Sequence, residues 1–398
     1  MPVGLFSDMV RPGPRKAGIL PSQEIRELIR NGKIRSRAEI SDDQIQPASI
    51  DLRLGSVAHR VRASFLPSKK ILIGPRTREL QLEEIDLSQP ALLRPHNVYI
   101  VPLLESLALP PEMSGKANPK STTGRLDIFT RLMTESSETF EVVPEGYSGE
   151  LFVEIVPRTF PIIVRAGTKL NQLRFFRGDL QSDDEHLRRL ARKGKLIFDE
   201  NGGGSPEPNI REGLRLSVDL GGERGNIVAY KAKNTESPID LAKIGAYEIA
   251  EFWEPVESGS LEGGLVLRAG DFYLLGSKER VGVPPGYAAE MESYDPSIGE
   301  FTVHYAGFFD PGFGYGTSGE VKGTKAVLEV RAHEVPIFLE DRQEVGRVKY
   351  LRMADTPDKL YGQGIGSSYQ QQGLALSKQF KKASSLEPAI HLQPSATY

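Results

Sequence analysis

The chain repeats itself, and this repeat constrains its fold more than any other feature. Three segments of the first half reappear in the second half at a nearly constant offset. The matching segments are 93–100 and 267–274, 107–111 and 281–285, and 152–155 and 327–330, with offsets of 174, 174 and 175 residues. A single offset shared by three separate segments predicts a tandem duplication of one domain.

The duplication divides the 398 residues into two similar halves. We predict a first domain at 1–200, a Gly/Pro-rich linker at 201–212 and a second domain at 213–398. Apolar residues mostly alternate with polar ones or form short runs, and 40 Gly and 28 Pro break the chain often. This pattern is typical of short strands joined by turns. Helices are expected only at Pro21–Gly32, where Ser22 can cap the start, and at Asp183–Lys193. The predicted fold class is therefore mainly β.

Composition excludes several functions. With no cysteine, the chain can form no disulfide, thiolate nucleophile or Cys-based zinc site, and its six histidines form no H-E-x-x-H pattern. A net charge of −3 gives no support for nucleic-acid binding. The Pro-broken N-terminus does not resemble a signal peptide, and no apolar run is long enough for a membrane. We expect a cytoplasmic protein with no protein-held metal.

Three features could carry chemistry. The basic, hydroxyl-rich turn Lys120–Arg125 suits a phosphate or a polarised carbonyl, or it is a solvated loop. Glu154 interrupts an apolar strand, so it lies on the surface or lines a pocket, and Glu329 repeats it in the second half. The Gly-rich segment Tyr361–Gly373 is either a lid that orders on ligand or a disordered tail.

In this order, the motifs resemble those of the dCTP deaminase family, which has the dUTPase-like fold. Residues 45–55, IQPASIDLRLG, are similar to the family's early signature, and 120–126 to its Ser-x-x-x-Arg turn. Glu154 falls on the strand that carries the family's catalytic glutamate. Residues 306–313, AGFFDPGF, resemble its Asp-Pro-Gly loop, and the 361–373 segment its closing tail. The resemblance implies two tandem dUTPase-like domains, each a distorted β-barrel or jelly roll.

Each half departs from the family pattern. The first has Pro144-Glu145-Gly146-Tyr147 in place of the Asp-Pro-Gly loop, and lacks the tail. The second has no basic residue at 295–300, where the Ser-x-x-x-Arg turn is expected, and Ser368 replaces the family's lysine. Because the resemblance implies sites between neighbouring subunits of a trimer, we expect the halves to have specialised, with the second half of the site coming from the same or another chain. The catalytic residues would be Glu154, Ser121 and Arg125. The substrate-binding residues would be Lys120, Ala306, Asp310, Phe313, Tyr361, Tyr369 and Gln372.

The resemblance implies a zinc-independent hydrolysis of dCTP to dUTP and ammonia. Glu154 would activate a water that attacks the cytosine, with Ser121 and Arg125 stabilising the developing charge. Alanine at Glu154 would then abolish turnover, while alanine at Glu329 would leave much of it. Mg2+ is expected on the triphosphate, and a homo-oligomer with trimeric or pseudo-trimeric domain packing. Two alternatives remain: a dUTP diphosphatase or bifunctional enzyme, and a non-catalytic nucleotide-binding or assembly module.

Overall fold

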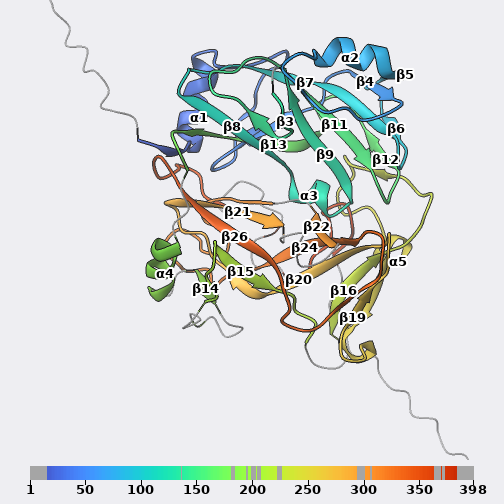
Figure 1. Ribbon diagram of the computed structural model, residues 1–398, viewed down its shortest axis with the longest axis vertical. Coiled ribbons are helices and arrows are strands. Elements are labelled where there is room, and N and C mark those ends of the chain that lie inside the picture. The colour runs from blue at the N-terminus through green and yellow to red at the C-terminus, as the bar shows by residue number, and fades with distance from the viewer. Residues whose placement is uncertain are drawn as a thin grey trace, which may run out of the picture.

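The structure is a computed structural model that describes residues 16–135, 137–180, 184–193, 196–198, 203, 208–221, 226–293, 301–304, 307–362, 369 and 373–382. The two halves form two β-rich domains, the first above the second in Figure 1. The prediction of two mainly β domains with a few short helices is confirmed. In the described part of the chain, no helix is both long and apolar enough to cross a membrane.

The first domain contains three sheets. One has the order β1-β13-β8-β10 with β3 beside β13; a second has the order β5-β4-β7-β11-β9 with β2 beside β7; the third contains β6 and β12. The strands are β1 (Gly18–Ile19), β2 (Ile34–Ser36), β3 (Ile50–Arg53), β4 (Val57–Val61), β5 (Gln81–Asp86), β6 (Ala91–Leu93), β7 (Val98–Ala108), β8 (Met113–Pro119), β9 (Ile128–Thr134), β10 (Val142–Val143), β11 (Ser148–Pro157), β12 (Ile162–Val164) and β13 (Lys169–Arg177).

The second domain repeats this arrangement. Its large sheet has the order β18-β16-β20-β24-β22 with β14 beside β20, its second sheet the order β15-β26-β21-β23, and β19 pairs with β25. The strands are β14 (Ile197–Phe198), β15 (Leu214–Ser217), β16 (Ile227–Ala232), β17 (Ile239–Asp240), β18 (Trp253–Glu257), β19 (Leu265–Leu267), β20 (Phe272–Val281), β21 (Tyr287–Ser293), β22 (Phe301–His304), β23 (Phe308–Phe309), β24 (Thr324–Ala332), β25 (Ile337–Leu339) and β26 (Glu344–Arg352).

Strand register confirms that the halves are copies. Glu154 on β11 lies opposite Ile100 on β7, and Glu329 on β24 lies opposite Leu274 on β20. These four positions keep the offsets found in the sequence. The two glutamates therefore occupy equivalent positions in equivalent sheets, and any difference between them comes from their neighbours.

The helices are short. They are α1 (Ser22–Arg30), α2 (Ile73–Leu80), α3 (Ser121–Gly124), α4 (Asp184–Arg192) and α5 (Ile249–Phe252), with 3-10 turns at Asp42–Gln44 and Ser258–Ser260. Pro21 rather than Ser22 occupies the N-cap position of α1, where no side chain caps the helix, and the Ser22 hydroxyl donates to Asp358. The predicted helix at 183–193 is α4, whose Leu187 and Ala191 join the core of the second domain. The structure thus places this helix with the second domain, not within a first domain ending at 200.

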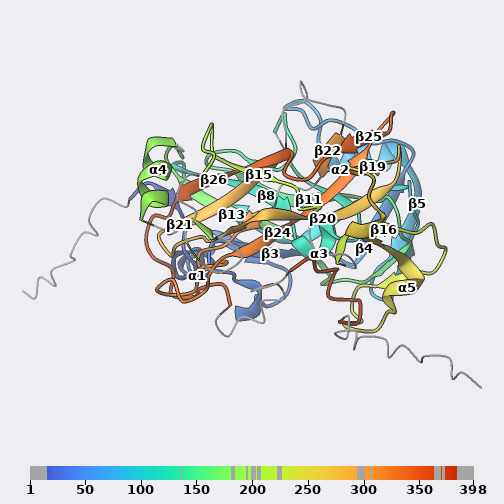
Figure 2. The ribbon, with the colours of Figure 1, turned by 90° about the horizontal axis from the view of Figure 1, so that it is seen from below.

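The domains share a continuous hydrophobic core. β17 of the second domain adds a parallel strand to β12 of the first, with Ile239 opposite Ile162. Phe160 of the first domain contacts Trp253 and Phe252 of the second edge to face. This interface brings the one-turn helix α3 against β24, as the two perpendicular views show (Figures 1 and 2).

Candidate active site

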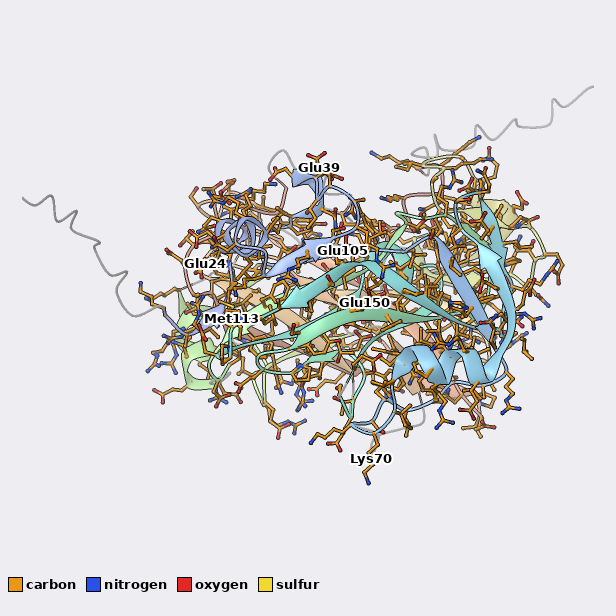
Figure 3. The ribbon with its side chains drawn as sticks, turned by 90° about the horizontal axis from the view of Figure 1, so that it is seen from above. Glu24, Glu39, Lys70, Glu105, Met113 and Glu150 are labelled. Atoms are coloured by element: carbon orange, nitrogen blue, oxygen red, sulfur yellow. The ribbon has the colours of Figure 1, made fainter. Side chains whose placement is uncertain are left out.

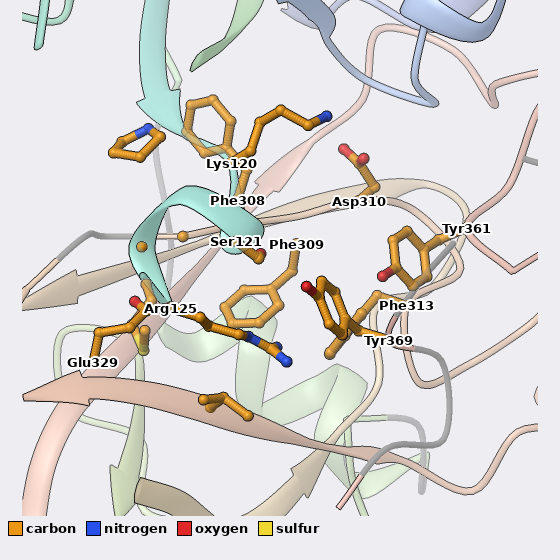
Figure 4. A pocket seen from close by; sticks show the side chains of 15 residues that line it. Lys120, Ser121, Arg125, Phe308, Phe309, Asp310, Phe313, Glu329, Tyr361 and Tyr369 are labelled. Carbon is orange, nitrogen blue, oxygen red and sulfur yellow. The ribbon is translucent and has the colours of Figure 1, made fainter. Parts of the chain in front are cut away.

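The one-turn helix α3 forms the first-domain side of the site. β8 ends at Pro119, and the Lys120 backbone N–H and the Thr123 hydroxyl both donate to the Leu170 carbonyl of β13. These bonds fix the turn on the sheet and direct the side chains of Ser121 and Arg125 toward the second domain (Figure 4).

Arg125 is buried by the C-terminal segment. Its Nη1 donates to the Ala375 carbonyl at 2.8 Å, and its guanidinium carbon lies 3.7 Å from the centre of the Tyr369 ring. The Ser377 hydroxyl donates to the Thr122 carbonyl on the same turn. The predicted closing segment therefore reaches α3 at the residues that the structure describes.

Glu329 provides the second-domain side. It is 5% exposed and lies against α3 so closely that a Cβ added to Gly124 would be 2.9 Å from its Oε1. Burial raises the pKa of the Glu329 carboxyl well above its ordinary value, and the nearby Arg125 charge opposes this shift. A carboxyl with a raised pKa in a cavity is a candidate acid or base.

The loop that contains β23 closes the site from the second domain. Phe308, Phe309, Asp310 and Phe313 all line the cavity. Phe309 and Phe313 pack with ring centres 5.0 Å apart, and Phe313 contacts Tyr361 at 5.3 Å. Burial raises the pKa of Asp310, and the Arg174 guanidinium opposes this shift.

Two cavities meet here. The inner one is small, about 50 Å³, and Ser121, Arg125 and Glu329 are among its lining residues. The outer one is about 540 Å³. They share Lys120, Ser121, Phe308, Asp310, Tyr361 and Tyr369. An open chamber therefore leads to a narrow, buried end that contains the glutamate.

Cations line the outer cavity. Lys120 forms an ion pair with Asp51 at 2.5 Å, and Lys169 with Asp43 at 2.6 Å. Burial, and then the Lys120 charge, lower the pKa of Lys378. Arg165 completes the set. Fixed cations of this kind suit a polyanionic ligand.

The structure brings together most of the predicted site residues. Ser121, Arg125, Lys120, Asp310, Phe313, Tyr361 and Tyr369 all line the inner cavity. Ala306 and Gln372 lie outside the described residues. Among the described members of the predicted set, only Glu154 lines neither cavity, and Glu329 is present in its place.

Glu154 is held inside the first domain. Its Oε1 accepts from Arg131 Nε at 3.0 Å and Nη2 at 2.5 Å, and its Oε2 accepts from the Ser64 hydroxyl at 2.5 Å. Ser64 belongs to the loop that precedes α2; Figure 3 shows this side of the domain, with Lys70 labelled on the loop. Arg131 in turn stacks on Phe140, with its guanidinium carbon 3.6 Å from the ring centre. Each carboxylate oxygen of Glu154 thus accepts at least one hydrogen bond within the first domain.

Sequence reasoning also missed Gly124 and Phe308, which line the inner cavity, and Arg174, which contacts Phe308 and Asp310. One sequence signal could have separated the two glutamates. In the paired strands, Arg131 lies opposite Glu154, whereas His304 lies opposite Glu329. An arginine directly opposite a glutamate on paired strands predicts an ion pair between the two side chains.

Residues 16–179 match the family model described as the 2'-deoxycytidine 5'-triphosphate deaminase (DCD) N-terminal domain, and residues 183–380 match the model of its C-terminal domain. The chain belongs to the 2'-deoxycytidine 5'-triphosphate deaminase family. Together the two matches span both domains of this deaminase-family chain, and their boundary falls just before α4.

Individual relatives agree with this assignment. A crystal structure of 2'-deoxycytidine 5'-triphosphate deaminase from Agrobacterium tumefaciens is 48% identical, with a TM-score of 0.78, and covers 85% of this chain and 100% of its own. The "dCTP deaminase, dUMP-forming" of Streptomyces coelicolor is 30% identical over 188 residues, 46% of this chain and 92% of that protein. The "dCTP deaminase, dUMP-forming" of Parafrankia sp. is 32% identical over 204 residues, which are 50% of this chain and 94% of that protein. These two relatives are thus about half as long as this deaminase-family chain.

Proposed function

We propose that the chain hydrolyses dCTP to dUTP and ammonia at one site between its two domains. The observation that carries the proposal is the convergence of Ser121 and Arg125 from the first domain with Glu329 from the second on one buried cavity. Neither domain alone contains this set, because the second lacks the Ser-x-x-x-Arg turn and the first holds Glu154 in an ion pair.

Glu329 is the proposed base. Its carboxylate takes a proton from a water molecule as the water oxygen bonds to C4 of the cytosine. The same proton then passes to the exocyclic nitrogen, the C4–N bond breaks and ammonia leaves, and the proton that stayed on the new oxygen moves to N3 to give the uracil ring. A pKa raised by burial suits this task, because the group must both accept and return the proton near neutral pH.

Ser121 and Arg125 flank Glu329 in the inner cavity. The Ser121 hydroxyl can orient the attacking water, and the Arg125 charge offsets the negative charge that develops on the ring. Arg125 is already held by Ala375 and Tyr369, so it need not reorganise during the reaction. Fixed charges of this kind give the largest electrostatic benefit.

The outer cavity is the proposed place for the sugar and phosphates. Lys120, Arg165, Lys169 and Lys378 line it, the first three in ion pairs with Asp51, Asp240 and Asp43 respectively. Among the described residues no group of three or more His, Asp or Glu side chains is arranged to hold a metal ion. Mg2+ is therefore proposed only as a counterion that phosphate oxygens and water hold on the substrate, and no deamination step depends on it.

The product decides between two versions of this function. The curated relatives are named as dUMP-forming, and the carboxylates of Asp51 and Asp310 line the outer cavity, where the phosphates are proposed to lie. A second hydrolysis that releases pyrophosphate is therefore the alternative. Incubation with dCTP and with dUTP, followed by measurement of ammonia, pyrophosphate and each nucleotide, separates the two.

The test of the proposed function uses the purified full-length chain with dCTP and Mg2+. We expect one ammonia per dUTP formed, unchanged after treatment with a zinc chelator. Tight dCTP binding without ammonia release would instead indicate a nucleotide-binding module. The predicted trimeric or pseudo-trimeric assembly stays a prediction, and light scattering on the same sample measures its mass.

A further inference from the structure

Arg174 crosses the domain interface behind the site. It lies on β13 of the first domain and is 2% exposed. Its Nη1 donates to the Ala289 carbonyl at 2.8 Å, and its Nη2 donates to the Phe309 carbonyl at 3.0 Å and to Asp310 Oδ1 at 3.1 Å. All of these acceptors belong to the second domain.

The acceptors belong to the loop that closes the inner cavity and to the strand β21 that pairs with it. Phe309 lies on β23, within the loop, and Ala289 lies opposite it on the paired strand β21. The Arg174 guanidinium carbon also lies 3.9 Å from the centre of the Phe308 ring. One side chain of the first domain thus contacts three consecutive residues, 308–310, which line the cavity.

A neighbouring contact strengthens the attachment. Lys116 on β8 lies opposite Arg174 in the first-domain sheet and forms an ion pair with Glu290, the residue after Ala289. The sheet that carries α3 is therefore fastened to the strand pair β21–β23 at two adjacent positions. The distance between the loop and the Ser121–Arg125 turn depends on this attachment.

Stability alone does not account for Arg174. Burying a guanidinium is costly, and an apolar residue of similar size is often as stable. The Nε of Arg174 is also buried without an acceptor among the described residues, which adds to the cost. Its fork instead fits a specific geometry, one carbonyl and one carboxylate of the 307–313 loop and one carbonyl of the paired strand β21.

We propose that Arg174 is a positioning residue, which fixes the 307–313 loop of the second domain against Ser121 and Arg125 of the first. It acts through Phe308, Phe309 and Asp310 and does not touch the substrate. The inference rests on the proposed deamination for its kinetic consequence, but the loop position itself can be measured independently.

The chain offers a matched control on the same strand. Arg177 is also buried, but its Nη2 donates to Glu24 at 2.7 Å and its Nη1 to the Lys16 carbonyl at 3.1 Å, and both of these acceptors belong to the first domain. R177M removes a buried arginine without touching the loop. R174M removes the one that crosses the interface, and R174K keeps a charge that can reach only part of the acceptor set.

Two measurements test the inference. We expect R174M to lower kcat for dCTP by about 100-fold, since small displacements of reacting groups cost this much. We expect R174K to recover part of the loss and R177M to keep kcat and KM within about twofold, all measured well below each variant's Tm. Equal kinetic losses in R174M and R177M would overturn the inference.

Amide hydrogen exchange measures the mobility of the loop independently of the reaction. Exchange in 307–313 should accelerate in R174M, to a smaller extent in R174K, and not in R177M. If R174M does not fold, R174K is compared with R177M instead. Unchanged exchange in the loop contradicts the inference even if the wild type deaminates dCTP. Absence of ammonia from the wild type, with faster loop exchange in R174M, contradicts only the proposed function.

Discussion

The carboxylate of Glu329 occupies the space that a side chain at position 124 would need. A Cβ on Gly124 would lie 2.9 Å from Oε1, 3.0 Å from Cδ and 3.1 Å from Oε2. The two residues come from different domains, so this contact measures how closely the domains approach. Glu329 can lie beside Ser121 and Arg125 only because position 124 is a glycine.

The substitution Gly124→Ala should displace Glu329 with little cost in stability. Gly124 lies in a helical turn, where alanine is favoured over glycine by about 1 kcal/mol. The new methyl group would push the carboxylate away, and we expect kcat to fall by about 10- to 100-fold. Steady-state kinetics with dCTP and a thermal melt measure both quantities. Gly286→Ala is the control, because nothing lies within 4 Å of its added Cβ. Wild-type kcat in G124A would contradict the assignment.

The two equivalent glutamates should behave differently. Glu329→Gln removes the proposed base, and we expect kcat to fall by about 10²- to 10⁴-fold. Glu154→Gln leaves the cavity intact but disrupts the bonds with Arg131 and Ser64, at a cost of roughly 1–3 kcal/mol. It should therefore lower Tm and keep kcat. This order is the reverse of the expectation from the sequence, and an inactive E154Q beside an active E329Q would restore the earlier assignment.

The pH profile of kcat/KM should show the raised pKa of Glu329. The base works when ionised, so activity should rise with pH through an apparent pKa above the ordinary glutamate value of 4.5. Because the Arg125 charge opposes the shift, Arg125→Gln should move this acid limb to higher pH. An acid limb at or below 4.5 in the wild type would show that Glu329 is not the titrating base.

The same group should influence stability, with a sign that follows from linkage. A carboxyl whose pKa is higher in the folded than in the unfolded chain stabilises the fold most below its unfolded pKa, and this contribution is lost as pH rises through the folded value. As pH is raised from 4.5 to neutral, the free energy of unfolding of E329Q should therefore fall less than that of the wild type. Denaturant unfolding at several pH values measures this, with E154Q as the matched comparison.

One dCTP should bind per chain. The position equivalent to Glu329 in the first domain is Glu154, whose carboxylate is occupied by Arg131 and Ser64. Titration calorimetry with E329Q, which should bind without turnover, gives the stoichiometry. Two equivalent sites per chain would show that the first-domain glutamate also belongs to a working site.

Much of the fold could be predicted from the sequence, because duplication and strand alternation are local patterns. The offset between 93–100 and 267–274 reappears as strand register, and predicted site residues of both halves, Glu154 excepted, line one cavity. The choice between Glu154 and Glu329 could not be made from equal positions in equal strands. It depends on what contacts each carboxylate, and Ser64 lies 90 residues from Glu154. Arg174 was missed for the same reason, since its acceptors are more than a hundred residues away.

The shared core that joins the domains has a consequence for how the enzyme responds to dilution. Both halves of the site belong to one covalent chain, and the Phe160–Trp253 contact and the β12–β17 pair hold them together. A site formed between separate subunits loses occupancy as the protein concentration falls, whereas a tethered pair keeps a constant effective concentration of each half for the other. Specific activity should therefore stay constant across nanomolar and micromolar enzyme. The tether also leaves each half free to lose the residues that its neighbour supplies.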